Sequence, residues 1–119
     1  MVRPLTALSI AATVMAGSLV AQEQAPNRRQ FSIVARDHAF VPARLQVSQD
    51  DLIKITFTAE GRPASFALDA YRIVKRAAGG QTIAFEFRAD LPGTFTFYCN
   101  LTSDAECRDM KGTLVVNPR

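Results

Sequence analysis

The residues best suited to chemistry lie in one polar loop near the C-terminus. The loop follows the stretch GTFTFY and contains Cys99, Cys107 and Met110. Thiolate and thioether sulfurs are soft ligands, and their spacing here suggests copper. Such a site would also need imidazole, yet the only histidine, His38, lies far away in the sequence. The loop is therefore a metal loop, the remnant of one, or a pair of cysteines that can form a disulfide.

Other kinds of chemistry find little support in the sequence. A nucleophilic cysteine needs a neighbouring base, and none accompanies Cys99. A dithiol redox module is disfavoured, because the two cysteines do not form a Cys-x-x-Cys motif and Arg108 is the only basic neighbour. The sequence has no glycine-rich phosphate loop and no basic run longer than Arg28-Arg29, which argues against nucleic acid as a partner. We therefore expect a protein that is not an enzyme.

The N-terminus is typical of a secretory signal peptide. A basic start with Arg3 precedes an uncharged run rich in Ala, Leu and Val, which ends in small residues before the polar QEQ. We predict a signal peptide over 1–21, cut after Ala21, and a flexible leader over 22–29; an uncleaved membrane anchor is the alternative. Removal of Arg3 leaves 13 basic and 11 acidic residues, a formal charge of +2. We expect the mature chain to be periplasmic or secreted, where a pair of cysteines can oxidise.

From Gln30 onward, apolar residues alternate with polar ones, and turn residues interrupt the pattern at short intervals. This period of two is typical of strands that bury one face. We expect strands over 31–35, 45–47, 53–57, 66–68, 71–75, 83–87, 95–99 and 113–117, a helical turn over 103–108, and a hairpin connection at 90–93. Seven or eight short strands in about 90 residues predict an all-β Greek-key sandwich over 30–119. Cys99 shares a face with Phe95 and Phe97, so its sulfur is predicted to point inward.

Three stretches of the sequence resemble the cupredoxins, and the resemblance covers residues 31–117. HAFVPARLQVSQDDLIKITFT is similar to the opening of plastocyanin-like domains, and GRPASFALD to the segment that carries the first copper-ligating histidine. FEFRADLPGTFTFYC followed by MKGTLVV resembles the binuclear copper domain of cytochrome oxidase subunit II and nitrous oxide reductase. The Tyr-Cys end of the strand and the Met-x-Gly return are the most specific features. The resemblance implies a cupredoxin-like sandwich.

Carried over one by one, the family's copper ligands are largely replaced. The first histidine falls at Ala64, which cannot bind a metal. In the binuclear version the loop reads Cys-x3-Cys-x3-His-x2-Met, and from Cys99 these offsets land on Ser103, Cys107 and Met110. A blue copper centre needs two imidazoles and one thiolate. The resemblance therefore implies that the usual electron-transfer site does not form here.

The same resemblance implies that Cys99 and Cys107 converge, because both positions face one metal in the family. We favour a disulfide between them, with metal ligation and free thiols as alternatives. Met110 is either a core residue or a ligand. His38 is predicted to lie at the copper end of the sandwich, as an exposed loop residue or as a replacement ligand.

These observations predict an exported cupredoxin-like domain with a degenerate copper site, no cofactor, and a structural or interaction role with a protein partner. We expect a monomer that makes no membrane contact once the signal peptide is removed. The alternative is a copper-binding protein, for copper handling or electron transfer, that uses Cys99, Cys107, Met110 and His38. Such a thiol-rich set would favour Cu(I) over Cu(II).

Overall fold

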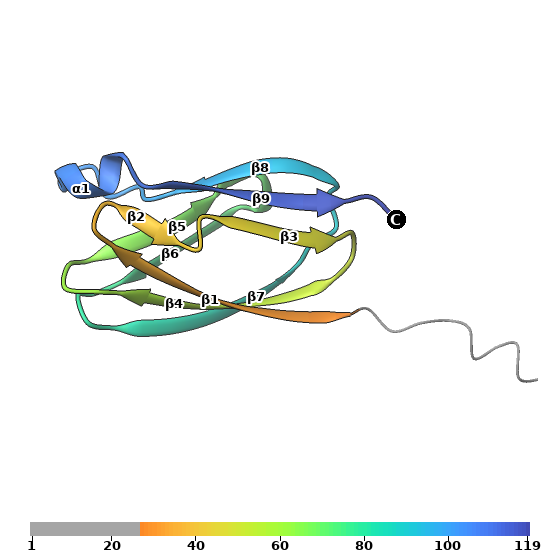
Figure 1. Cartoon of the computed structure of the whole chain (residues 1–119), viewed down its shortest axis with the longest axis horizontal. Helices are drawn as coiled ribbons and strands as arrows, with labels where there is room; N and C mark the ends of the chain where they lie inside the picture. The colour runs from red at the N-terminus through yellow and green to blue at the C-terminus, as the bar shows by residue number, and fades with distance from the viewer. Residues whose placement is uncertain (1–26) are drawn as a thin grey trace, which may run out of the picture.

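The computed structural model describes residues 27–119, which form two sheets packed face to face (Figure 1). The four-stranded sheet has the order β2-β1-β4-β7, and the five-stranded sheet has the order β3-β9-β8-β5-β6. The prediction of an all-β sandwich is confirmed. The predicted signal peptide and residues 22–26 of the predicted leader lie outside the described residues. The first strand begins at Arg28, so Arg28 and Arg29 belong to the sandwich and not to the leader.

The strands are β1 (Arg28–Arg36), β2 (Ala39–Val41), β3 (Arg44–Ser48), β4 (Leu52–Ala59), β5 (Ala64–Leu68), β6 (Ile73–Ala77), β7 (Thr82–Arg88), β8 (Gly93–Tyr98) and β9 (Lys111–Asn117). A 3-10 turn, η2 (Asp69–Tyr71), lies between β5 and β6, and the helix α1 (Ala105–Arg108) lies within the predicted helical turn. The structure has one strand more than the alternation predicts, because β2 is only three residues long. Tyr71 was predicted to begin a strand but lies in η2, and β6 starts at Ile73.

The predicted hairpin at 90–93 is wrong, because this segment crosses between the sheets. β7 is the edge strand of one sheet, and β8 lies between β9 and β5 in the other. The hydroxyl of Tyr71 holds the crossing segment: it donates to the carbonyl oxygen of Leu91 at 2.9 Å and accepts from the backbone N–H of Leu91 at 3.1 Å. Burial raises the pKa of Tyr71 above its ordinary value. Turn residues alone do not distinguish a hairpin from such a crossing.

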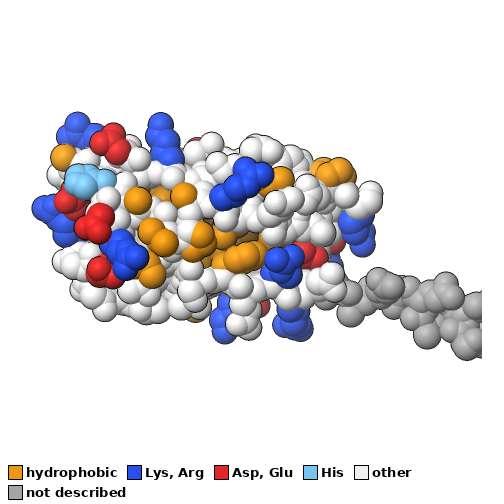
Figure 2. All heavy atoms as spheres, in the orientation of Figure 1, with side chains coloured by type: hydrophobic (Ala, Val, Ile, Leu, Met, Phe, Trp, Pro, Cys, Tyr) orange, Lys and Arg blue, Asp and Glu red, His pale blue; other side chains and the backbone are white. Residues whose placement is uncertain are grey.

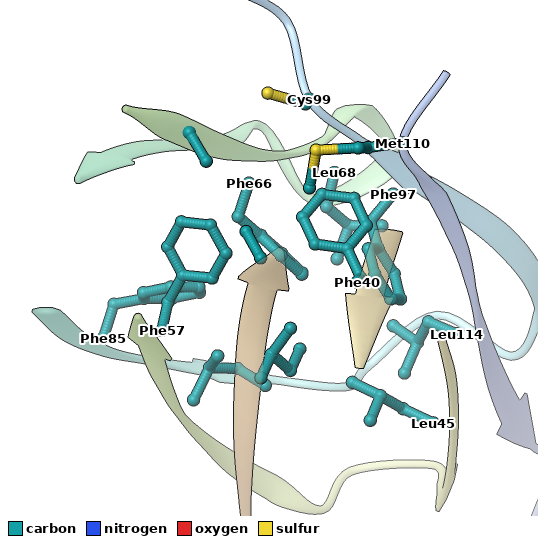
Figure 3. Packing of buried hydrophobic residues seen from close by; sticks show 14 of the residues in the cluster. Phe40, Leu45, Phe57, Phe66, Leu68, Phe85, Phe97, Cys99, Met110 and Leu114 are labelled. Carbon is teal, nitrogen blue, oxygen red and sulfur yellow. The ribbon is translucent and has the colours of Figure 1, made fainter. Parts of the chain in front are cut away.

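A cluster of phenylalanines forms the centre of the core (Figure 3). Phe66 of β5 lies within this cluster, with ring centroids 4.8 Å from Phe97, 5.3 Å from Phe85 and 6.2 Å from Phe57. Phe40, from the short strand β2, adds a ring 5.2 Å from Phe97. Strand alternation predicts the inward positions of Phe57, Phe66, Phe85 and Phe97, whereas Phe40 lies in the strand that was not predicted. Because this cluster continues to Cys99 and Met110, the core supports one end of the sandwich directly.

Candidate functional site

The four candidate site residues lie at one end of the sandwich. Cys99 follows β8, Cys107 lies in α1, Met110 precedes β9, and His38 lies in the turn between β1 and β2. A shallow depression at this end is lined by His38, Cys107 and Met110, together with Ala64 at the start of β5. The fold therefore brings together segments that are widely separated in the sequence, as the resemblance implied. It also places Ala64 beside the ligand loop, where the family has its first histidine.

Cys99 and Cys107 form a disulfide, with their Cα atoms 5.2 Å apart. Both residues are buried, with exposed fractions of 5% and 2%. Backbone donors approach both sulfurs: the N–H of Ser65 lies 3.3 Å from Cys99 Sγ, and the N–H of Leu101 lies 3.1 Å from Cys107 Sγ. The sequence left three alternatives for these cysteines, namely a disulfide, metal ligation and free thiols, and the structure contains the disulfide. Neither sulfur is a thiolate in this state, and the thiolate is the form that binds metal.

A buried serine connects β5 to the beginning of the ligand loop. Ser65 has no exposed surface. Its hydroxyl donates to the side-chain oxygen of Asn100 at 2.6 Å and accepts from the backbone N–H of Asn100 at 2.7 Å. Sequence analysis did not single out Ser65, because a serine with outward register in a strand carries no distinctive signal. The structure makes it a link between the Ala64 segment and the loop.

Replacement of Ser65 by Ala is expected to lower the free energy of unfolding by about 1–3 kcal/mol, because it leaves the N–H of Asn100 without its acceptor in a partly buried position. Urea denaturation with the disulfide intact measures the effect. The matched control is Ser48→Ala on the exposed surface of β3, for which little change is expected. Equal stabilities of the two variants would show that the Ser65 link is energetically unimportant.

Contacts of the acidic residues Asp104 and Glu106 join α1 to two other loops. Glu106 lies 3.2 Å from Arg62, which precedes β5, and 3.2 Å from His38 Nε2 in the β1–β2 turn. Asp104 lies 4.0 Å from Arg62 and also caps the helix, since its carboxylate accepts the backbone N–H of Glu106 at 2.9 Å. Exposed pairs of this kind contribute little singly, about 0–1 kcal/mol each. Their arrangement nevertheless links three segments across the mouth of the depression.

His38 is positioned for this contact with Glu106 and not for a bond to the cysteine sulfurs. It occupies a two-residue turn with Asp37, in which the φ angles are 51° at Asp37 and 64° at His38. Positive φ at both positions gives a turn whose twist matches that of the flanking strands. The side chain of His38 is 56% exposed and reaches toward Glu106. Its predicted location at this end is confirmed, and its surroundings are those of an exposed loop residue.

The residues at this end do not fit the copper centre of the family. Ala64 has no donor atom, and the two cysteine sulfurs are bonded to each other. Figure 3 shows Met110 and Cys99 at the same end of the phenylalanine cluster, where Met110 is buried as part of the core. Within residues 27–119, no group of three or more His, Cys, Asp or Glu side chains is arranged to hold a metal ion. The geometry instead describes a covalently closed loop held by hydrogen bonds and ion pairs.

This sandwich, with a ligand-type loop between its last two strands, defines a class of proteins. The chain belongs to the cupredoxin-like domain family, whose model matches residues 8–116. The match begins inside the segment that we interpret as a signal peptide. The resemblance deduced from the sequence is thus confirmed.

Solved structures share the fold at low sequence identity. Auracyanin A, a blue copper protein from Chloroflexus aurantiacus, is 19% identical, with a TM-score of 0.65 over 76% of this chain and 100% of its own. The multicopper oxidase mgLAC is 17% identical, with a TM-score of 0.66 over 77% of this chain but only 39% of its own. A heme-copper terminal oxidase is 14% identical, with a TM-score of 0.65 over 75% of this chain and 65% of its own. A search of curated protein sequences finds no match. At these identities the likeness shows the fold alone.

Proposed function

We propose that the protein is an exported, non-enzymatic cupredoxin-like domain that acts through contacts with a protein partner. The observation that carries the proposal is the disulfide between Cys99 and Cys107, which occupies two of the family's ligand positions. In the family, a metal joins the ligand loop to the segment that here contains Ala64. In this chain the bonds of Ser65 to Asn100 connect the same two segments. The end of the sandwich is therefore held together without copper.

Export is supported by the agreement of two independent features. The N-terminal sequence has the layout of a signal peptide, and a buried disulfide is typical of proteins in oxidising compartments. Residues 27–119 include no helix long and apolar enough to cross a membrane. We infer a periplasmic or secreted protein that folds as a monomer.

Copper handling is the second candidate, and one observation favours it. Cys107 and Met110 line the same depression, with His38 at its rim. Reduction of the disulfide would supply two thiols there, and a set of soft sulfur ligands favours Cu(I). Since the ligand is the thiolate, this activity would require the reduced protein.

A thiol count combined with copper titration separates the two candidates. Protein purified from an oxidising compartment is expected to show no free thiol under denaturing, non-reducing conditions and to give no thiolate-to-copper absorption band with Cu(II). A tight Cu(I) complex in the protein as purified, lost in Cys99→Ser, Cys107→Ser and Met110→Leu alike, would instead establish copper handling. Elemental analysis of the same preparation provides an independent measure of the bound copper.

Restoring the missing imidazoles tests whether the loop still has the geometry of a cupredoxin copper site. Ala64→His combined with Cys107→His is expected to give an intense thiolate-to-Cu(II) band, because both positions border the same depression and Cys99 becomes a free thiol. Each single substitution serves as a control and should remain without this band. A folded double variant that stays colourless would show that the loop no longer has a cupredoxin geometry.

A further inference from the structure

β6 forms an open edge of the five-stranded sheet. It is the last strand in the order β3-β9-β8-β5-β6, and among the described residues it pairs only with β5. Its five residues, Ile73–Ala77, contain neither proline nor glycine. Such an edge presents unpaired backbone N–H and carbonyl groups to an additional strand. The backbone at β6 is thus suited to pairing with an extended chain.

The side chains on this edge combine one apolar contact with positive charge. Val74 is 59% exposed, more than either of the other exposed large hydrophobic residues in the described part of the chain. Lys75 and Arg76 follow it, and Arg72 precedes the strand; all three are exposed. None of them makes an ion pair with another residue of the described chain, since the recorded pairs involve other cations. The edge therefore carries three cations whose charge is not neutralised by a close carboxylate.

The opposite edge of the same sheet lacks this combination. β3 begins with the exposed Arg44, but its apolar residues Leu45 and Val47 are buried in the core. An added strand at β3 would find no exposed apolar side chain to cover. This contrast makes β6 the better docking edge and β3 the natural control.

The charges also determine what kind of chain fits. A second copy paired through its own β6 would bring Lys75 and Arg76 close to identical cations, and like charges on neighbouring strands destabilise the pair. Basic edge residues often prevent self-pairing in this way. A partner strand with carboxylates avoids that repulsion. Charge complementarity thus selects an acidic occupant.

We infer that β6 binds an extended acidic segment of a protein partner by strand addition. In an antiparallel arrangement, carboxylates would lie opposite Arg76 and Lys75, and an apolar residue opposite Val74. Read in the direction of the partner strand, this order is acidic, acidic, apolar. The inference deepens the proposed function, because it names the chemistry of the partner that the proposal requires.

The test uses the full chain, exported and purified from an oxidising compartment, and a synthetic peptide containing Thr-Glu-Glu-Val-Thr. Binding is expected at low salt, to weaken as ionic strength rises, and to slow amide hydrogen exchange in residues 73–77. Lys75→Glu with Arg76→Glu should weaken the affinity about tenfold or more. Arg44→Glu with Lys111→Glu, which makes the same charge change near β3, should leave the affinity within about twofold.

Two further peptides distinguish strand pairing from simple charge attraction. A Thr-Lys-Lys-Val-Thr version should not bind, and a backbone N-methylated acidic version should lose binding although its charge is unchanged. No binding of the acidic peptide, or protection outside β6, would overturn the inference. So would vesicles of anionic lipid that bind through Lys75 and Arg76 while the peptide does not. The copper titration is independent of these results, so failure here leaves the interpretation of the disulfide end intact.

Discussion

Replacing Phe66 by Ala is expected to lower the free energy of unfolding by about 3–5 kcal/mol, because a large buried side chain is lost and a cavity remains. The neighbouring side chains cannot readily fill the space that the ring of Phe66 leaves, because they are already closely packed. The ring centroids of Phe97 and Phe85 lie 4.8 and 5.3 Å from that of Phe66. The loss also affects the site, because Phe66 follows Ser65, which contacts both Cys99 and Asn100.

Chemical denaturation of oxidised protein measures this effect. Phe66→Leu is the control that keeps most of the volume, and its cost should be about 1.5 kcal/mol or less. A cost for Phe66→Ala of less than about 2 kcal/mol would mean that the core collapses into the space, contrary to the close packing observed. In that case the phenylalanine cluster would not be the rigid support of the disulfide end.

Cys107→Ser is expected to lower the free energy of unfolding by about 2.5 kcal/mol, by the loop-entropy estimate for the closed segment 99–107. The disulfide restricts the unfolded chain, and the effect is moderate because the loop is short. Loss of the bond should also loosen α1, which has only four residues and cannot persist as an isolated helix. Urea denaturation gives the stability, and hydrogen exchange at residues 105–108 reports on the helix.

Three comparisons make this prediction specific to the bond. The double variant Cys99→Ser with Cys107→Ser and the reduced wild-type chain should be destabilised to a similar extent. Ser103→Ala, in the same loop but without a cysteine, should change stability little. If reduction leaves the stability unchanged, the disulfide contributes nothing to folding, and a role for the two thiols in metal binding becomes the better explanation.

The alternation of residues was sufficient to predict the sandwich and the inward direction of Cys99, because a period of two directly encodes which face of a strand is buried. It could not show that residues 90–93 change sheets. The crossing segment is bound by Tyr71, whose hydroxyl contacts Leu91 from a distant position in the chain. Pairing between remote segments leaves no local pattern in the sequence.

The candidate site, like the fold, could be predicted from the sequence only in part. The ligand loop could be predicted from the positions of Cys99, Cys107 and Met110, since their order resembles a known motif. The ion pairs of Arg62 could not be predicted, because an arginine before a strand is common and its two acidic partners lie in another loop. A set of weak contacts between loops has no fixed sequence spacing that could be recognised.

The position of β9 has a consequence for the order of folding. β9 lies between β3 and β8, and it is the only strand among the described residues that pairs with β3. The pairing is parallel and joins residues 44–48 to residues 113–117, so a large part of the chain must be closed into a loop before it can form. Closing such a long loop costs entropy before any contact compensates for it, which slows folding. While the chain is being synthesised, β3 cannot join its partner strand until residues 113–117 have been added.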